Sequence, residues 1–531
     1  MDTKEEQMKN KLLFLKTQSK KDKIFTIMSW AIFAFAFIFL CVFLIVKIDF
    51  YLDSDMSSEM ILADLLKEEN GLIISKNWFY STEIRVIYIQ LIFKLLFSIT
   101  QNWHIVRVIS SICLYILMLF SLYFFCYQAG IKKYFPCIAT ILILPTHNDY
   151  FYSVILGLYY ITYLITLFVL FGCVFLFLKQ NKKLKKIFCL IVVAIISLFT
   201  TLGGPRLIMT FYAPIAIMAF VCLLYYRKSE YKDIYNKFFI IAFVLGLSAL
   251  IGYIVNIFYL HNNYSFLSQE SQIDMSPNFL NLGLSVWNFG LMFGLNADIS
   301  ILSVPSYILA VLLLTIFIIA TINILRKNTY SRNEKILTQY CLFACLVFSI
   351  ISLFYNQFIH GRFNVPIYIF MVPVIFIFFK QEKFKINKII IPLTIVLFAF
   401  NVSLNYVRYW QKSPNIEKIS ITKLLIDKEY YNGYAAFWNG NVLTELSDGQ
   451  IEVWVYEDIN GFSNGDNVEK WLQNKEHLEK FPEGKVFLLY SMEEFNNLNN
   501  KDILSKQIVL YQSESYIVYG FSSYNEFKML F

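Results

Sequence analysis

Charged residues are scarce in this chain. Only 16% of its 531 residues are Asp, Glu, Lys or Arg, whereas 57% are hydrophobic and 18% are aromatic. Soluble globular proteins carry about 25% charged residues, so a soluble fold is excluded for most of the chain. The deficit predicts a protein that is surrounded by lipid over much of its length.

Cysteine is absent from the last part of the chain. All nine cysteines lie between Cys41 and Cys345, and residues 406–531 contain none. This absence excludes a disulfide framework and a cysteine-ligated zinc site in the C-terminal segment. The chain also lacks a Walker phosphate-binding loop, an H-E-x-x-H zinc helix and an internal repeat, so none of these features indicates a function.

Long apolar runs fill the first four hundred residues. A helix needs roughly 20 apolar residues to cross about 30 Å of hydrocarbon, and such runs recur here between polar and charged clusters. They predict a polytopic all-α transmembrane bundle of about eleven spans. The predicted spans are residues 24–46, 104–126, 133–146, 153–178, 187–203, 207–225, 238–259, 300–325, 338–355, 364–379 and 388–405. The third span is the shortest.

Lys and Arg collect in every second loop. Basic clusters precede span one and follow spans two, four, six, eight and ten. Because basic loops tend to stay in the cytoplasm, the N-terminus is predicted to be cytoplasmic. Eleven spans then place residues 406–531 outside the plasma membrane. These residues include 12 basic and 18 acidic side chains, a net charge of −6, although the whole chain has a formal charge of +8. We therefore expect no nucleic-acid partner.

The chain divides into three predicted regions, which are a basic cytoplasmic N-terminus (1–23), a multi-span transmembrane domain (24–405) and a C-terminal domain (406–531). The transmembrane domain has a long first outer loop, 47–103. Apolar residues at helical spacing predict two membrane-surface helices in it, at 57–69 and 86–99. A second long outer loop, 260–299, is predicted to contain an interfacial helix near residues 287–293.

Beyond Trp410 the composition changes to mixed charge, Asn and Gly, with short β-rich runs. The strands are predicted at 434–438, 451–456, 486–490 and 508–511, and the helices at 418–427, 441–446 and 467–479. Strands that alternate with helices indicate an α/β domain with a largely parallel sheet. The predicted fold class is therefore a polytopic helical bundle with a small extracytoplasmic α/β domain.

Acidic residues cluster just beyond the outer end of span one. Asp53, Asp55 and Glu59 lie there, and Asp49 precedes them. Acids are common in exported loops, so this cluster is also consistent with a merely solvated loop. Four acids within eleven positions, directly against the bilayer, favour a functional role instead, because unpaired charge is costly at that depth.

A carboxylate in this place suits the transfer of a sugar from a lipid phosphate to a hydroxyl. The acceptor hydroxyl needs a base, whereas the phosphate leaves without strong acid help. One carboxylate of the Asp53 and Asp55 pair therefore suffices. The other would orient it, or the pair would hold a divalent cation such as Mg²⁺ or Mn²⁺ if the reaction uses one.

Cationic residues are predicted at the same membrane level, where they would bind an anionic phosphate. Arg206 ends the Gly-Gly-Pro-Arg turn between spans five and six, and Arg362 follows His360 and a glycine between spans nine and ten. An isolated arginine would more often reach the interface for its own solvation. Two arginines in Gly- and Pro-interrupted outer loops favour phosphate binding, because guanidinium donates in pairs. His360 is a weaker candidate.

Two further outer segments mix aromatic and polar residues, around 78–83 and 146–150. Aromatic rings suit stacking on sugars, but interfacial aromatic belts have the same composition. Glu83 and Asp149 in these segments are predicted as secondary substrate-binding acids.

Together these features resemble the GT-C glycosyltransferases, polytopic enzymes that use sugars on polyprenyl-phosphate carriers. In that superfamily a catalytic Asp follows the first span, the first outer loop holds two membrane-surface helices, and a soluble domain often ends the chain. Asp53 or Asp55 matches the catalytic position, and 406–531 matches the soluble domain. The runs 433–441 and 443–447 look like the tail of bacterial membrane proteins related to this group.

The resemblance implies an inverting transfer from a carrier such as an undecaprenyl-phosphate sugar. The acceptor would be a hydroxyl of a cell-surface glycan, teichoic acid, lipid or protein at the outer face of the cell envelope. Asp53 would be the base, Asp55 or Glu59 would support it or bind the metal, and Arg206 and Arg362 would bind the carrier phosphate.

Two other functions fit a many-span bundle of this kind. A polymerase or ligase of polyprenyl-linked glycans would be expected to have a long, arginine-bearing late outer loop. A flippase or transporter for lipid-linked glycans would be expected to have ionisable residues near mid-membrane or related halves.

Overall fold

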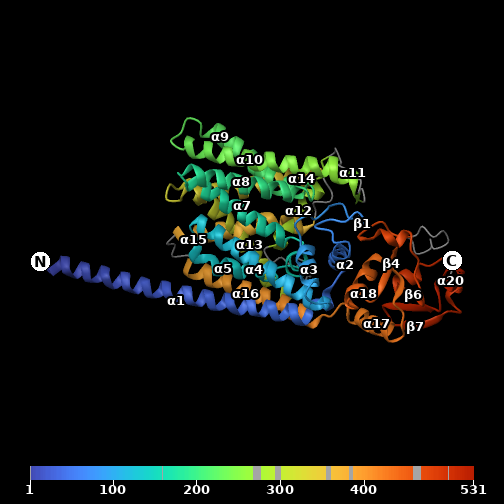
Figure 1. Ribbon diagram of the computed structural model, residues 1–531. Coiled ribbons are helices and arrows are strands. Elements are labelled where there is room, and N and C mark those ends of the chain that lie inside the picture. Colours follow the sequence, from blue (N-terminus) through green and yellow to red (C-terminus); the bar gives the residue numbers. More distant parts are fainter. Residues whose placement is uncertain are drawn as a thin grey trace.

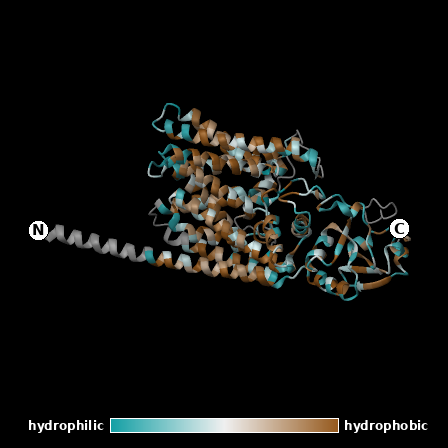
Figure 2. Ribbon diagram, viewed as in Figure 1, coloured by the Kyte–Doolittle hydropathy of each residue, from teal (hydrophilic) through white to brown (hydrophobic). Residues whose placement is uncertain are grey.

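The protein forms a long helical bundle with a smaller domain at one end (Figure 1). This computed structural model describes residues 2–157, 159–266, 277–292, 301–354, 360–381, 387–457, 468–499 and 501–530. Hydrophobic residues predominate along the bundle, and the C-terminal domain is more mixed (Figure 2). We call the end of the bundle that contacts the C-terminal domain the domain end, and the opposite end the basic end.

Nine helical segments of the described residues are long and apolar enough to cross a membrane. The first begins at Lys23, within α1 (Asp2–Lys47). The others are formed mainly by α4 (Trp103–Ala129), α7 (Ile161–Lys179), α8 (Lys183–Thr201), α9 (Ala213–Tyr225), α10 (Lys232–Val255), α13 (Val304–Arg326), α14 (Arg332–Phe354) and α15 (Val365–Gln381). They coincide with nine of the eleven predicted spans. The eleventh predicted span falls on α16 (Asn387–Gln411), whose first side chains are outside the described residues. A multi-pass membrane protein is therefore confirmed.

The third predicted span, 133–146, is not a spanning helix. It contains η2 (Lys132–Tyr134) and α5 (Phe135–Ile143), and a nine-residue helix is only about 14 Å long. After α5 the chain is extended, and Asn405 Nδ2 on α16 donates to the carbonyls of Pro145 and Thr146, both at 3.1 Å. A side chain of the neighbouring helix thus satisfies backbone groups that lie outside a helix.

This broken segment nevertheless returns the chain to the domain end. Lys179 Nζ, at the end of α7, donates to the carbonyl of Gln128 near the end of α4. The starts of both helices face the C-terminal domain end, where the Trp103 amide donates to Asp448 Oδ1 at 2.6 Å. Because α4 and α7 run in the same direction, the chain between them has to pass back along the bundle.

The first outer loop contains η1 (Ile48–Tyr51), α2 (Ser54–Glu68), β1 (Trp78–Tyr80) and α3 (Gln90–Phe97). The two predicted helices are therefore present, with different ends. Most side chains of α2 are buried, because the helix is packed between the bundle and α18 (Phe437–Leu446) of the C-terminal domain. It is therefore an internal helix of this molecule.

The second long loop contributes α12 (Phe279–Met292), which agrees with the predicted helix except that Phe293 lies outside the described residues. Short elements complete the bundle. They are α6 (Asn148–Tyr150), η3 (Phe151–Leu156), η4 (Ile208–Tyr212), η5 (Asn256–Leu260), α11 (His261–Asn263), β2 (Ser265–Phe266), η6 (Ile301–Ser303) and η8 (Gly361–Asn364).

The C-terminal domain is built on a five-stranded sheet with the order β4-β3-β6-β8-β7. Its strands are β3 (Asn432–Ala436), β4 (Glu452–Tyr456), β6 (Val486–Ser491), β7 (Ile508–Gln512) and β8 (Tyr516–Phe521). Strand β3 is parallel to its two neighbours, β4 and β6, whereas β8 is antiparallel to β6 and β7. The sheet is thus mixed, and β8, which was not predicted, makes it so.

Helices cover the sheet. Leu425 of α17 (Ile416–Asp427) and Leu443 of α18 pack against Val453 and Phe487 on one face. Short elements α19 (Met492–Asn496), η11 (Lys501–Leu504) and α20 (Tyr524–Lys528) complete the domain. The predicted helices 418–427 and 441–446 therefore coincide with α17 and the second half of α18.

The predicted helix at 467–479 is wrong. Residues Gln473–Asn474 form β5, which pairs with β1 of the first outer loop, and η10 (Lys475–Leu478) follows. The backbone of Leu472 has a φ of 47°, which interrupts a right-handed helix. Pairing with a distant strand has overridden the local helical pattern.

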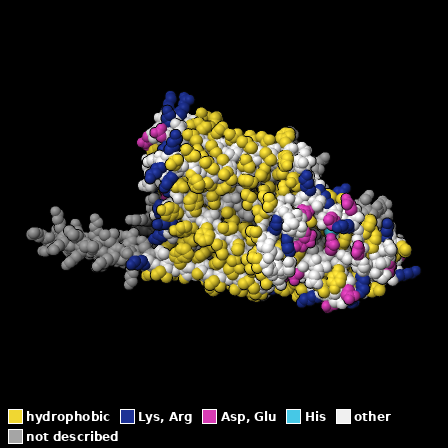
Figure 3. Space-filling view, in the orientation of Figure 1, with side chains coloured by type: hydrophobic (Ala, Val, Ile, Leu, Met, Phe, Trp, Pro, Cys, Tyr) yellow, Lys and Arg dark blue, Asp and Glu magenta, His cyan; other side chains and the backbone are white. Residues whose placement is uncertain are grey.

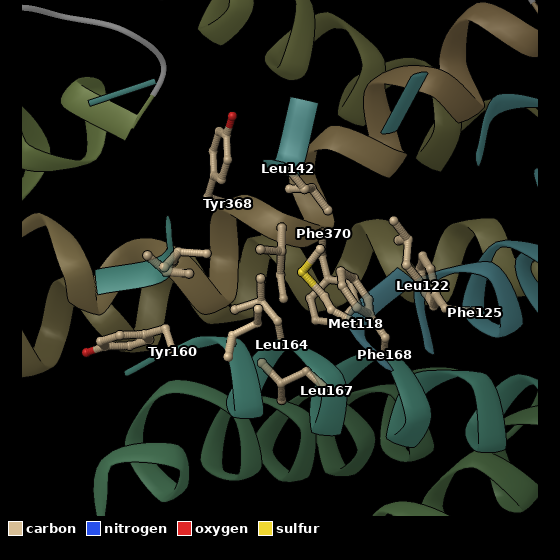
Figure 4. Close-up of a cluster of buried hydrophobic side chains, with 14 of the residues drawn as sticks. Met118, Leu122, Phe125, Leu142, Tyr160, Leu164, Leu167, Phe168, Tyr368 and Phe370 are labelled. Atoms are coloured by element: carbon tan, nitrogen blue, oxygen red, sulfur yellow. The ribbon is translucent and has the colours of Figure 1, made fainter. Parts of the chain in front are cut away.

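Aromatic rings fill the centre of the bundle (Figure 4). The ring centroids of Phe125 on α4 and Phe168 on α7 are 5.7 Å apart, and Phe370 on α15 lies 5.5 Å from Phe125. All three side chains are fully buried. Because aromatic contacts favour specific ring geometries, this cluster fixes how α4, α7 and α15 meet.

Candidate active site

Asp53 is the first residue of the site and caps the N-terminus of α2. Its backbone is extended (φ −118°, ψ 168°), and its Oδ1 accepts the amide of Met56 at 2.7 Å. The hydroxyl of Tyr159, just before α7, also donates to Oδ1 at 2.9 Å. A capping acid is favoured at this position because the first amides of a helix lack partners.

The pKa of Asp53 is raised to about 6. Burial is the main cause, and the negative charge of Asp55 adds to it, whereas the hydrogen bonds from Met56 and Tyr159 act in the opposite direction. A carboxyl with this pKa is largely ionised at neutral pH and still accepts a proton readily. Such a shift in a buried acid is typical of functional sites.

Asp55 lies in the first turn of α2, and its pKa is also raised, chiefly by burial. The positive charges of Arg85 and Arg362 partly offset that effect. Asp55 therefore lies within the electrostatic reach of two arginines from different loops. One of these, Arg362, is a predicted phosphate ligand.

Glu59, one turn further along α2, is paired with Arg85. Arg85 Nη1 donates to Glu59 Oε1 at 2.6 Å, and the Glu59 side chain is only 7% exposed. The guanidinium carbon of Arg85 also lies 4.9 Å from the ring centroid of Tyr88 and 5.0 Å from that of Tyr159. Arg85 thus connects Glu59 with the tyrosine that donates to Asp53.

Sequence reasoning missed Arg85. The sequence pattern that could have found it is the one that indicated Arg206, which is an arginine in an outer loop next to an apolar stretch. Arg85 directly precedes the apolar stretch that begins at Val86, and its partner Glu59 is 26 positions away in the sequence.

Arg206 is paired with Glu83, which was predicted as a separate secondary acid. Arg206 Nη2 lies 3.3 Å from Glu83 Oε2. The preceding glycines permit this approach, because Gly204 has a φ of +135° and a Cβ there would lie 3.1 Å from Glu83 Cγ. Close packing against the first outer loop therefore explains why glycines precede Arg206 in the Gly-Gly-Pro-Arg turn.

The guanidinium of Arg206 lies between two aromatic rings. Its central carbon is 5.6 Å from the ring centroid of Tyr160 and 5.4 Å from that of Phe363. Tyr160 follows the tyrosine that donates to Asp53, and Phe363 follows Arg362. Arg206 therefore joins the loop of Arg362 to the elements that hold Asp53.

Arg362 and His360 lie at the start of η8, and both are exposed. The guanidinium of Arg362 is 5.5 Å from the ring centroid of Phe363, and its charge acts on both Asp55 and Tyr160. Asp149 contacts the same turn, because a Cβ on Gly361 would lie 2.6 Å from Asp149 Oδ2. The predicted residues Asp149, His360 and Arg362 are therefore on one side of the site, beside Arg206.

A second arginine that sequence reasoning missed, Arg107 on α4, forms a buried ion pair with Glu445 on α18. Arg107 Nη2 donates to Glu445 Oε2 at 2.7 Å and to the carbonyl of Met56 at 2.9 Å. The two side chains are 2% and 3% exposed. This pair ties the C-terminal domain to the helix that Asp53 caps.

Whether the site could hold a divalent cation depends on how many ligand groups lie around Asp53 and Asp55. Within the described residues no group of three or more His, Cys, Asp or Glu side chains could hold a metal ion. Asp53 Oδ1 already accepts two hydrogen bonds, and Glu59 is paired with Arg85. The two aspartates alone do not make a metal-binding set.

No protein-family model matches the chain, and no curated protein matches it.

Proposed function

We propose that this protein is a membrane glycosyltransferase of the GT-C type that moves a sugar from a polyprenyl-phosphate carrier to an acceptor hydroxyl. The observation that carries the proposal is Asp53, a buried carboxylate with a pKa raised to about 6. Burial of the carboxylate is the main cause of that shift. The charge of Arg107 acts on Asp53, and the charges of Arg85 and Arg362, from two different loops, act on the neighbouring Asp55.

The chemistry follows from these groups. Asp53 takes the proton of the acceptor hydroxyl as its oxygen bonds to the anomeric carbon. The bond from that carbon to the phosphate oxygen breaks, and both bonding electrons leave with the phosphate. Attack from the face opposite the leaving group inverts the anomeric centre. The Tyr159 hydroxyl keeps Asp53 oriented, and the charge of Asp55 raises the basicity of Asp53.

The leaving phosphate needs cationic partners. Arg206 suits this role because its single contact with Glu83 is 3.3 Å long and its side chain is 20% exposed, so other donors of its guanidinium can bind an anion. Arg362 is exposed on the neighbouring loop. Both would stabilise the charge that develops on the phosphate as the sugar leaves.

An apolar groove between α9 and α10 suits the lipid chain of the carrier. It has a volume of about 390 Å³, and it is lined by residues of the two helices and η4, among them Ile208, Tyr212, Ala219, Phe239 and Leu250. Ile208 lies two residues after Arg206, so the groove begins near the proposed phosphate ligand. The lining is almost entirely apolar, which favours an aliphatic ligand.

The distribution of charge supports an outward-facing site. In Figure 3, Lys and Arg side chains gather on the end of the bundle away from the C-terminal domain. If that basic end faces the cytoplasm, then the C-terminal domain and the site lie on the extracytoplasmic face. A carrier phosphate at the outer leaflet would meet Arg206 and Arg362 there.

A polymerase or ligase of polyprenyl-linked glycans is the nearest alternative and would use the same arginines. The position of the raised-pKa acid before the transmembrane helices α4 and α7, rather than in a late loop, favours the transferase. A flippase would need a bundle that opens alternately to the two faces of the membrane. A flippase moves its substrate without forming a bond, so it gives Asp53 no reason to be held as a base.

The test compares Asp53→Asn and Asp55→Asn with the control Asp64→Asn, in a strain that lacks the native gene. Asp64 lies on the same helix, is about one-third exposed and contacts only Lys67 at 4.0 Å among its charged neighbours. Surface glycans are compared with those of the deletion strain by mass spectrometry. We expect Asp53→Asn to lower the rate roughly 10²- to 10⁴-fold and Asp64→Asn to restore full modification. Full restoration by Asp53→Asn would overturn the proposal.

A further inference from the structure

Two segments of the C-terminal domain flank Asp53. Asn415, which precedes α17, donates through Nδ2 to the carbonyl of Leu52 at 2.7 Å. On the other side, the Ser54 hydroxyl donates to the carbonyl of Phe437 at the start of α18. The residues before and after Asp53 are therefore each bonded to the start of a different helix of the C-terminal domain.

A buried lysine lies one turn into the first of these helices. Lys418 is 8% exposed, and its Nζ donates to the carbonyl of Trp438 at 2.9 Å. Within the described part of the chain no carboxylate lies within ion-pair distance of this ammonium group. The charges of Asp53 and Glu494 act on this ammonium, but it is bonded to the Trp438 carbonyl and to neither carboxylate. An ammonium has three donors, so the remaining donors favour an anionic ligand.

Trp438, at the start of the second helix, is 62% exposed. It follows Phe437, which contacts Ser54, and its carbonyl accepts the bond from Lys418. A large aromatic ring left in solvent beside a buried cation is suited to stacking on a sugar ring. Lys418 and Trp438 therefore present complementary recognition groups from two adjacent helix starts.

The sheet topology places both residues where α/β proteins bind ligands. The chain passes from β3 to β4 on one side and then to β6 on the other side of β3. Ligands bind outside the carboxyl ends of parallel strands at such a change of direction. Here Ala436 ends β3 and α18 begins at the next residue, so this edge of the sheet faces α2.

The position of this edge relative to α2 is firmly fixed. The buried Arg107–Glu445 pair joins α4 to α18 and also bonds the Met56 carbonyl of α2. Strand β5 extends the contact by pairing with β1 of the first outer loop. A ligand on the edge would thus be held in a defined position relative to Asp53.

We propose that the carboxyl edge of β3 is the acceptor site of the enzyme, where Trp438 stacks on a sugar ring of an anionic glycan and Lys418 binds its phosphate or carboxylate. The inference rests on the proposed transferase function and names its acceptor class. It gives the C-terminal domain the role of presenting an acceptor hydroxyl to Asp53, while the arginines of the transmembrane domain bind the donor. The negative charge of Asp53 also acts on the ammonium group of Lys418.

The experiment measures binding of each substrate separately, with the full-length protein in detergent. The acceptor probe is wall polysaccharide from a deletion strain, immobilised either intact or after hydrogen fluoride has removed its phosphodiesters, and neutral dextran is the reference. The donor probe is undecaprenyl phosphate. The variants are Lys418→Met and Trp438→Ala. Their matched controls are Lys423→Met, which is exposed on the same helix, and Tyr431→Ala, which is exposed at the other end of β3.

We expect Lys418→Met and Trp438→Ala each to lower retention of intact polysaccharide by roughly tenfold or more, as the loss of a charge-assisted hydrogen bond or a ring contact implies. Undecaprenyl phosphate binding and both controls should be unchanged. Lys418→Arg, which keeps the charge, should keep most of the retention and shows that the fold is intact. If hydrogen fluoride treatment abolishes the effect of Lys418→Met, the anion is a phosphate, and otherwise it is a carboxylate.

Two results would overturn the inference in different ways. Unchanged polysaccharide retention in both variants, together with loss of modification in Asp53→Asn, would reject the acceptor site and leave the transferase function in place. Weaker undecaprenyl phosphate binding in Lys418→Met would assign the lysine to the donor. Surface glycans that are identical in wild-type and deletion strains would reject the transferase function, and the acceptor site with it.

Discussion

Two arginine–glutamate pairs at the domain end differ in how completely they are satisfied. Arg107 and Glu445 are 2% and 3% exposed, and the guanidinium donates to both carboxylate oxygens and to the Met56 carbonyl. Arg206 and Glu83 are 20% and 10% exposed and meet through a single contact of 3.3 Å. Burial therefore closes the first guanidinium off from a ligand, whereas the second is partly exposed to one.

The difference separates structural from functional charge. A buried pair contributes little net stability when it replaces apolar packing, yet loss of one partner is severe, because the other charge stays buried. A partly exposed pair with a single contact can keep that contact while other donors of its guanidinium bind a substrate anion. We therefore interpret Arg107 as a structural link between the domains and Arg206 as a ligand.

The largest expected effect is that of Glu445→Gln on stability. The change leaves the Arg107 guanidinium buried without its counter-charge, which costs about 3–5 kcal/mol. We expect a large fall in the thermal unfolding temperature in detergent and weaker docking of the C-terminal domain, seen as faster proteolysis after residue 411. Glu452→Gln is the control, because Glu452 is 54% exposed and its pair with His477 is worth at most about 1 kcal/mol. Equal unfolding temperatures for the two variants would remove the distinction between the pairs.

Arg206→Gln should have the opposite profile, with a large effect on the rate and a small one on stability. Loss of a cation that stabilises the leaving phosphate lowers kcat roughly 10²- to 10³-fold. Arg206→Lys should restore only part of the rate, because an ammonium lacks the planar fork of guanidinium. The rate of sugar release from the carrier and the unfolding temperature are measured together, with Arg227→Gln in the basic loop as the control. A variant that unfolds early but keeps its rate would show that Arg206 is structural.

The candidate site was predictable where its signals are local. Asp53 and Asp55 lie within three positions of each other at the start of a helix, and Arg206 follows two glycines and a proline. In each case the residue type and its immediate neighbours indicate the role. The spans were predictable for a similar reason, because hydropathy and loop charge are properties of short windows.

Residues whose role depends on a distant partner were not predictable. Glu445 is 338 positions from Arg107. The proposed role of Lys418 depends on the docking of α17 beside Leu52, which lies far from it in the sequence. The broken third span has the same origin, because Asn405 on a late helix stabilises its extended backbone. In the C-terminal domain, β5 replaces a predicted helix because its partner, β1, belongs to the first outer loop.

The smallest expected effect is that of Tyr159→Phe on the pH dependence of the transfer rate, through the pKa of Asp53. A base acts only when deprotonated, so the rate should rise with pH and level off above the pKa of Asp53, about 6. The Tyr159 hydroxyl stabilises the charged carboxylate and lowers this pKa. In Tyr159→Phe the pKa therefore rises, and the rising part of the profile moves to higher pH.

We expect Tyr159→Phe to lose a few-fold in rate at pH 6 and almost nothing at pH 8, where both proteins are deprotonated. Tyr152→Phe is the matched control. Tyr152 is also close enough to Asp53 for that charge, together with burial, to raise the pKa of its hydroxyl, but the hydroxyl that donates to Asp53 is that of Tyr159. The measurement is the initial rate of sugar transfer from pH 5 to pH 9. An equal loss at every pH would mean that Tyr159 supports the fold around Arg85 rather than the protonation of Asp53.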